Sequence, residues 1–413
     1  MIRDDVRLAL VLGLLALPLL CAHVVYNFVI PQTPARMARS AADLIPRMSL
    51  WSAVTLLPLP IPEQGEQIAI ALIAFATIAF AAYGAALYVS WKQPKRPASA
   101  GAALIAALVF SATSVVALPN VNSDIFIYIA HGRTTAAHHH NPYYTSPDQF
   151  PDDPILPYAS ARYATAVEDK LPAWAWINIP LAWLAGDDPV TSLLVYRAAF
   201  LLFNLASLAL VAAILQKFNP QYWLTGVILY AWNPIVALHG QSKVDTVMVF
   251  FLLLGILLLL TARGVRRAVA LVAFALSVFI KLFTVPLLAG YWLWELRAGQ
   301  WRRVLRDVLV FAITALVIYA PFMEDPGLIV RTNMNLLVRA APAIPVPFRL
   351  LLAGGFALFL LWAGRAYEGR PATLLGSWAI VGLSFSLYLA NLGLAHYLIT
   401  LIAVASLAPN WRV

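Results

Sequence analysis

Residues 122–133 hold three side chains that could do acid–base chemistry together. Asp124, Tyr128 and His131 stand at positions i, i+4 and i+7, which share one face of an α-helix. They directly follow a long apolar run, so a helix here would point them together from a membrane surface. A carboxylate in that place can take a proton from a hydroxyl. The alternative is a solvated helix start, in which Asp124 only favours the helix dipole.

A histidine run follows at 138–140, and Asn141 and Tyr143 come directly after it. Consecutive residues point in different directions in both helix and strand, so three adjacent imidazoles do not converge on one ion. No metal-binding spacing of histidines occurs here. Nearby acids could add oxygen ligands, so a metal site stays open as an alternative. We expect instead a loop that hydrogen-bonds hydroxyl groups, with no metal and no cofactor.

A second polar cluster lies between two apolar runs, at 232–245. It contains His239, Gln241, Lys243 and Asp245, and Asp245 begins the second run. A carboxylate costs about 2.5–3.5 kcal/mol at the bilayer centre and less at its edge. Pairing with Lys243 or with another cation would offset that cost. The alternative is a simple polar hairpin turn.

Lys281 lies inside the apolar run 268–294, where one straight span would place it at the bilayer midplane. We expect instead a hairpin of two short helices with Lys281 near its tip. Arms of about 13 residues are about 20 Å long, less than the ~30 Å hydrocarbon core, so the tip would stop in the outer leaflet. There the ammonium can bind a lipid phosphate. Plain snorkelling to the interface is the alternative.

The composition indicates what positions these residues. Of the 413 residues, 62% are hydrophobic and 11% are charged, and the mean hydropathy is +0.79. Soluble domains average about 45–50% apolar and 25% charged residues. We therefore predict an all-α polytopic membrane protein with about 12 transmembrane segments, forming a single integral membrane domain over 1–413. The apolar runs lie at 8–30, 67–91, 101–119, 190–216, 221–239, 244–262, 268–294, 304–322, 344–364, 372–390 and 393–409.

Basic residues in the short connections set the predicted orientation. The net charge of +9 falls mainly there, which places both termini in the cytoplasm. Three polar stretches then face outward: 31–65, 120–189 and 322–343. The stretch 120–189 carries 8 of the 19 acidic residues and four of the seven histidines, so it is the expected extracytoplasmic catalytic loop. Its aromatic run at 172–183 is too short to span and predicts a juxtamembrane helix.

Four motifs in this order resemble the GT-C superfamily of polytopic glycosyltransferases, particularly its bacterial mannosyltransferase-type branch. They are the acid after a span in Ser123-Asp124-Ile-Phe-Ile-Tyr128, the later Asn141-Pro142-Tyr143, Gly240-Gln241 entering a span, and Ile280-Lys281-Leu-Phe-Thr-Val-Pro286. The family often places its acid after the first span, whereas Asp124 follows the third. The resemblance implies that Asp124 is the general base and that polyprenyl-phosphate sugars are the donors.

The resemblance and the layout together predict an inverting hexosyltransferase, most simply a mannosyltransferase, on the outer face of a bacterial plasma membrane. Its partners would be a polyprenyl-phosphate sugar donor, a lipid-linked or cell-wall glycan acceptor, and membrane lipids. A polyprenyl phosphate is already a good leaving group, and fixed cations would stabilise its growing charge. The residues expected to contact the donor phosphate or sugar are Arg133, Lys243, Lys281, His131, Tyr128, Asn141, Tyr143, His239, Gln241, Asp245 and Arg331.

Other function classes fit less well. A transporter or lipid flippase is the main alternative, but such proteins show inverted repeats with ionisable groups near the midplane. Here the polar residues gather at one leaflet. A metal-dependent membrane hydrolase built on the histidine run is a second alternative. The sequence contains no nucleotide-binding glycine motif, and no basic stripe with interleaved aromatic residues indicates nucleic-acid binding.

Overall fold

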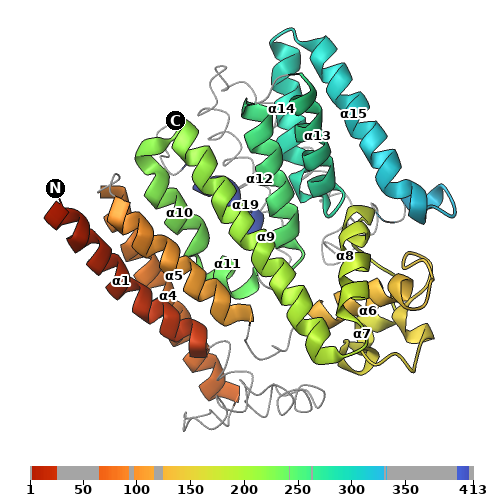
Figure 1. Ribbon diagram of the computed structural model, residues 1–413, viewed down its shortest axis with the longest axis horizontal. Helices are drawn as coiled ribbons and strands as arrows, with labels where there is room; N and C mark the ends of the chain where they lie inside the picture. The colour runs from red at the N-terminus through yellow and green to blue at the C-terminus, as the bar shows by residue number, and fades with distance from the viewer. Residues whose placement is uncertain are drawn as a thin grey trace. The chain divides into compact units, whose positions relative to one another are not determined.

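The computed structural model describes residues 2–25, 65–92, 97–115, 124–240, 242–261, 264–329, 332 and 398–408. Every regular element within these ranges is a helix, as the predicted all-α class requires (Figure 1). The α-helices are α1 (Ile2–Val24), α4 (Gly65–Lys92), α5 (Pro97–Val115), α6 (Asp124–Ala136), α7 (Ala161–Ala164), α8 (Pro172–Ala185), α9 (Pro189–Phe218), α10 (Trp223–Ala231), α11 (Pro234–His239), α12 (Asp245–Thr261), α13 (Val265–Val278), α14 (Val285–Arg297), α15 (Trp301–Tyr319) and α19 (Leu398–Ser406). The 3-10 helices are η4 (Pro147–Gln149), η5 (Leu156–Tyr158), η6 (Pro220–Tyr222), η7 (Leu282–Thr284) and η8 (Ala320–Phe322).

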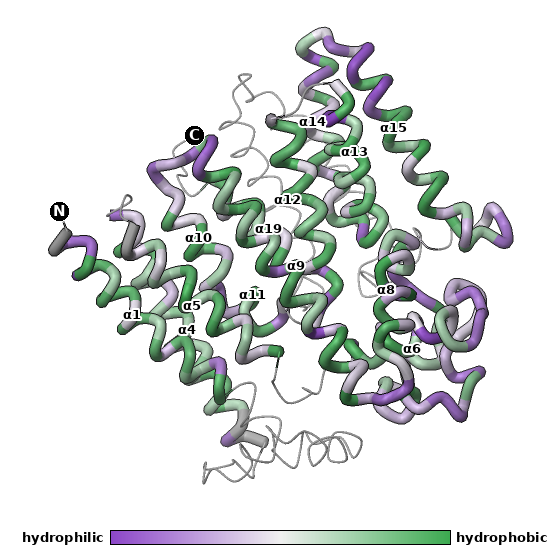
Figure 2. The backbone as a smooth tube through the Cα atoms, viewed as in Figure 1, coloured by the Kyte–Doolittle hydropathy of each residue, from purple (hydrophilic) through white to green (hydrophobic). Residues whose placement is uncertain are grey.

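Four helical segments of the described ranges are long and apolar enough to cross a membrane: Asp4–Val24, Ala69–Lys92, Pro189–Phe218 and Trp301–Phe322. Two shorter apolar helices are Ser99–Val115 and Asp245–Thr261. Figure 2 shows apolar residues along α4, α9 and α12, and hydrophilic residues in the loops after α6. These features indicate a membrane protein. The total of about 12 spans stays a prediction, because the runs 344–364 and 372–390 lie outside the described residues.

The chain divides into two compact units, and each is described separately. The first unit comprises Met1–Glu168, Ile177–Leu205 and Val227–Lys243. The second comprises Asp169–Trp176, Ala206–Gly226 and Val244–Val413. The prediction of a single membrane domain with a catalytic loop at 120–189 is not tested by this division and stays a prediction.

In the first unit, α1 packs against α4 and α5, and α11 packs against all three (Figure 1). Hydrogen bonds between distant residues hold this bundle together. The Trp232 indole N–H donates to the Ala103 carbonyl at 2.9 Å, and the Ser114 hydroxyl donates to the Ala237 carbonyl at 3.0 Å. Inside a membrane such polar groups need internal partners, since lipid offers none. Exposed Leu10, Leu14 and Ile73 on α1 and α4 leave apolar surface that suits lipid contact.

The hydropathy pattern predicted one span over the apolar run 221–239. The structure has two short helices there instead. α10 ends at Ala231, and α11 begins after Asn233, whose backbone is extended. The residue before a proline avoids the α conformation, and Pro234 has no N–H to continue the helix. The Asn233 side chain accepts a hydrogen bond from the Ile235 N–H at 3.0 Å and so caps α11.

The second unit contains the expected helical hairpin at 268–294. α13 and α14 have 14 and 13 residues, and Lys281 lies in the break between them. At the tip, the Ser277 hydroxyl donates to Thr284 Oγ1 at 3.1 Å. At the base, Arg267 lies 3.5 Å from the Glu295 carboxylate and 2.6 Å from that of Asp307. Arg267 and Glu295 join the start of α13 to the end of α14, and Ser277 and Thr284 join the end of α13 to the start of α14, whereas Asp307 belongs to α15. α13 and α14 therefore run antiparallel, which confirms the predicted hairpin.

Close helix packing supports the hairpin from its other side. α13 packs on α12 in the second unit. A Cβ atom on Gly255 would lie 2.6 Å from the Phe274 ring and 3.2 Å from the Ala270 carbonyl oxygen. Only a residue without a side chain permits this approach. Gly255 therefore allows α12, which begins with Asp245, to lie close to α13, the helix that precedes Lys281.

Candidate active site

Helix α6 begins at Asp124, which fits both the predicted helix that aligns Asp124 with Tyr128 and His131 and the alternative of a helix start. The helix is fixed in the first unit by Asn178, whose side-chain N–H donates to the Tyr128 carbonyl at 2.8 Å. The Tyr196 hydroxyl in turn donates to the Asn178 side-chain oxygen at 2.6 Å. A Cβ on Gly132 would lie 2.8 Å from Ala182 Cβ, so glycine allows α6 to approach α8. Buried, satisfied polar contacts of this kind fix the position of a helix.

Asp124 forms an ion pair with Lys243, which lies 119 residues later in the chain. The Lys243 side chain is only 1% exposed, whereas that of Asp124 is 26% exposed. The buried ammonium thus holds one carboxylate oxygen, and part of the carboxylate remains open to solvent. A fixed carboxylate with an accessible side is the arrangement that a general base requires.

The helical spacing predicted that Tyr128 and His131 would reach the surface together with Asp124. In the structure they do not. They are 3% and 5% exposed, and the Tyr128 ring packs edge-on against Phe200 at 6.4 Å. A face of a helix can carry both a surface residue at its end and buried residues further along. Of the three aligned side chains, Asp124 is the one with partial access to solvent.

Arg133, predicted to bind donor phosphate, forms ion pairs within its own unit. Its Nε lies 2.9 Å from Asp153, and one terminal nitrogen lies 2.9 Å from Asp187. The other terminal nitrogen donates to the Gly186 carbonyl at 2.6 Å. Asp153 also contacts His138 Nε2 at 2.7 Å. Because the guanidinium is 4% exposed and has these partners, it holds the loop after α6 against the start of α9.

Asn141 and Tyr143 form a tight turn after the histidine run. The Asn141 side-chain oxygen accepts from the Tyr143 N–H at 3.1 Å, and its carbonyl accepts from Thr145 N–H at 2.9 Å. His138 stacks on Phe150, with ring centroids 3.9 Å apart. Within the described ranges, no group of three histidine, cysteine or acidic side chains is arranged to hold a metal ion.

Asp153 offers a test of this loop. Replacing it with Asn removes the charge that faces both Arg133 and His138, and should lower the free energy of unfolding by about 1–3 kcal/mol. Thermal unfolding in detergent measures the change. Asp152→Asn, at the exposed neighbouring position, is the matched control and should unfold like the wild type. Equal stability of both variants would mean that the cluster does not organise the loop.

A second ion pair lies in the second unit, between Asp245 and Lys281. The Lys281 Nζ lies 2.7 Å from Asp245 Oδ2, and the two side chains are 5% and 0% exposed. The sequence left open whether Lys243 or another cation pairs with Asp245, and the structure assigns Lys281. Lys281 also lies over the Phe283 ring, 5.5 Å from its centroid.

The segment before α8 lies along the tip of the hairpin, also within the second unit. Leu171 N–H donates to the Ile280 carbonyl at 3.2 Å, and Ala173 N–H donates to that of Phe279 at 3.0 Å. Lys170 and Asp169 therefore lie near enough to Lys281 to interact electrostatically with its ammonium. Lys170, which the structure pairs with Asp169, was not singled out from the sequence. Its place next to the aromatic run 172–183 was the available signal.

Three further residues were predicted to contact the donor: His239, Gln241 and Arg331. His239 ends α11 in the first unit and is half-buried. Gln241 and Arg331 lie outside the described residues. Lys243 and Asp245 are separated only by Val244, and their partners Asp124 and Lys281 come from the two regions that the sequence motifs singled out.

A family model for the N-terminal domain of alpha-(1→6)-mannopyranosyltransferases matches residues 35–296, more than half of the chain. The chain belongs to this mannosyltransferase family. The predicted resemblance is thereby confirmed, and this member of a mannosyltransferase family is a glycosyltransferase. No curated protein and no solved structure matches it. The matched region contains both ion pairs and Lys170, whereas Arg331 lies beyond its end.

Proposed function

We propose that this protein transfers mannose from a polyprenyl-phosphate donor to a hydroxyl of a lipid-linked or cell-wall glycan, on the outer face of a bacterial plasma membrane. The observation that carries the proposal is a partly exposed carboxylate, Asp124, held by the buried Lys243 in a chain of a mannosyltransferase family. The test is transfer of labelled mannose from polyprenyl-phosphate mannose by the purified protein.

Asp124 acts as the general base in this proposal. As the acceptor oxygen attacks the anomeric carbon of mannose, its proton passes to the Asp124 carboxylate and the bond from that carbon to the phosphate oxygen breaks. Polyprenyl phosphate leaves with the bonding electrons. The α-(1→6) linkage for which this family is named suggests the 6-hydroxyl of a mannose residue as acceptor. An inverting enzyme that forms an α-linkage requires a β-linked donor.

The cations at the hairpin tip are the proposed phosphate contacts. Lys281 and Lys170 lie close enough to interact electrostatically in the second unit, and each is paired with a carboxylate, Asp245 and Asp169 respectively. A phosphate that gains negative charge as the bond breaks is stabilised by such fixed cations. We assign Arg133 a positioning role, because its guanidinium holds two carboxylates and the Gly186 carbonyl at once and so fixes the loop after α6. We assign Asn141, His239 and Gln241 to sugar binding, whereas Tyr128, His131 and Tyr143, which are 3%, 5% and 4% exposed, are assigned to packing around the site.

The membrane orientation is tested by placing a cysteine in the outer loop. In a Cys21→Ser background, which removes the native thiol, Gln149→Cys introduces an exposed thiol between α6 and α8. We expect an impermeant maleimide to label it in sealed right-side-out vesicles, because the predicted topology places 120–189 outside. Ala298→Cys, in the turn between α14 and α15, is the matched control for the cytoplasmic side and should be labelled only after lysis. The reverse pattern would contradict the proposed membrane face.

A further inference from the structure

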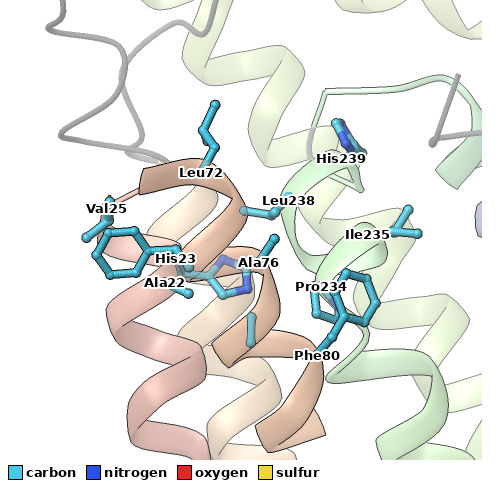
Figure 3. Close-up of a pocket in the computed structure, with 12 residues that line it drawn as sticks. Ala22, His23, Val25, Leu72, Ala76, Phe80, Pro234, Ile235, Leu238 and His239 are labelled. Atoms are coloured by element: carbon cyan, nitrogen blue, oxygen red, sulfur yellow. The ribbon is translucent and has the colours of Figure 1, made fainter. Parts of the chain in front are cut away.

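A cavity of about 210 Å³ lies among α1, α4 and α11 in the first unit. Leu72 and Ala76 of α4 and Pro234 and Leu238 of α11 line it with apolar surface (Figure 3). His23, near the end of α1, is also part of its wall. His239 at the end of α11 lines it as well, so the cavity combines a mostly hydrocarbon lining with two imidazoles.

His23 has no hydrogen-bond partner on either ring nitrogen among the described residues. The side chain is 2% exposed and stacks face to face on Phe110, with ring centroids 5.3 Å apart. In this position the ring is shielded from water. A buried polar group without a partner destabilises a protein, and such a group in a native structure calls for an explanation.

The side chains that line the cavity indicate what kind of ligand it can bind. A neutral imidazole offers one N–H donor and one acceptor nitrogen, so an oxygen-bearing group can satisfy it. Apart from His239, the remaining lining is apolar and accepts hydrocarbon. A ligand that meets both conditions has a long apolar chain with an oxygen near one end, which describes a membrane lipid.

The cavity lies where such a lipid can enter. His23 is at the end of the candidate span Asp4–Val24, and Leu72 is near the start of Ala69–Lys92. The predicted topology places these two ends at the outer leaflet. α11, which forms the third wall, leads to Lys243 four residues after its end, and Lys243 holds Asp124.

We propose that this cavity binds the chain of a membrane lipid, with an oxygen of the lipid hydrogen-bonded to His23. The same chemistry belongs to a polyprenyl-phosphate substrate and to a bulk glycerophospholipid. The inference rests on the proposed function only if the substrate lipid is the occupant.

Photolabelling of the full-length protein in nanodiscs tests the proposal. The probe is a polyprenyl phosphate with a diazirine near its phosphate end, and mass spectrometry maps the labelled peptides. Ala76→Phe fills the cavity from an exposed position of α4. Ala74→Phe adds the same ring at an exposed alanine that does not line the cavity, so it is the matched control.

We expect label on the peptides of α1 and α4 to fall about tenfold with Ala76→Phe and to remain unchanged with Ala74→Phe. Competition by unlabelled polyprenyl phosphate, but not by phosphatidylglycerol, identifies the substrate lipid. Competition by both identifies a bulk-lipid site, which also supports the proposal. Equal labelling of the two variants, or no label on these helices, would overturn it.

A second variant separates binding from folding. His23→Phe keeps a ring that can stack on Phe110 but removes the buried nitrogens, so the empty protein should unfold at the same or a higher temperature. Its labelling should nevertheless fall about 3- to 10-fold, because the lipid oxygen loses its partner. Undiminished labelling of this variant would overturn the role of His23. Since labelling needs no transfer, wild-type labelling without mannosyl transfer would count against the proposed function alone.

Discussion

Asp124→Asn should reduce turnover by at least 100-fold, with donor binding retained. The amide has the shape of the carboxylate and can still accept a hydrogen bond from Lys243, but it cannot take the acceptor's proton. General-base catalysis typically contributes about 10²–10⁴-fold. Neutralising a carboxylate near a phosphate removes repulsion, so the donor should bind at least as well. Transfer of labelled mannose at saturating donor gives turnover, and equilibrium binding of the donor gives affinity.

Two controls make this result specific to Asp124. Asp148→Asn changes an exposed acid of the same loop and should transfer mannose like the wild type. Asp124→Asn leaves the buried Lys243 ammonium without its counter-charge and should lower the unfolding temperature, so turnover is measured at a temperature at which thermal unfolding shows the variant to be folded. Activity within a few-fold of the wild type would make Asp124 a helix-start residue. The base would then have to be sought at Asp245 or Asp153.

Lys281→Met should destabilise the protein by about 3–5 kcal/mol, because it leaves the fully buried Asp245 carboxylate without its cation. The sequence alone did not assign Asp245 as the partner of Lys281, so the loss of stability is predicted only from the ion pair. The free energy of unfolding in mixed micelles measures the effect. Lys217→Met, at an exposed position near the end of α9, is the control cation and should have little effect.

A double variant separates the phosphate role of Lys281 from its structural role. Lys281→Met with Asp245→Leu replaces the buried pair by apolar side chains, which is often neutral for stability. We expect it to recover most of the lost stability but to bind the donor about 10- to 100-fold more weakly, since a charged hydrogen bond is worth about 1.5–3 kcal/mol. A double variant with wild-type donor affinity would refute the phosphate contact. A single variant as stable as the wild type would refute the ion pair.

The sequence predicted the elements around the site because their causes are local. The basic clusters on both sides of 268–294 required an even number of crossings, and a run too short for two full spans required a hairpin. Lys281 in the middle of the run then had to be at the break, where the structure places it. Likewise the i, i+4, i+7 spacing correctly predicted helix α6.

The pairing of charges could not be predicted, because it depends on contacts between distant residues. Asp245 lies 36 residues before Lys281, and spacing alone did not favour this cation over Lys243. Arg133 resembled a phosphate ligand until the structure placed Asp153 and Asp187 beside it. Helical spacing aligns side chains on one face but does not say which part of that face packs inside, so the burial of Tyr128 was not foreseen.

The interruption at Asn233 and Pro234 had a local signal that mean hydropathy concealed. The run 221–239 is apolar throughout, so its length alone predicted one span. A proline preceded by an asparagine favours a helix end followed by a capped helix start, and the structure has both. The Asn233-Pro234 dipeptide therefore predicts two helices where the mean hydropathy of the run predicts one.

The central claim, mannosyl transfer from a polyprenyl phosphate, is tested most directly with the purified wild-type protein in lipid nanodiscs. Radiolabelled polyprenyl-phosphate mannose and GDP-mannose are supplied in parallel with a mannose-terminated glycolipid acceptor, and the product linkage is determined. We predict label in an α-(1→6)-linked product from the polyprenyl donor only, and none when Asp124→Asn replaces the wild type. Transfer from GDP-mannose, with none from the polyprenyl donor, would contradict the account.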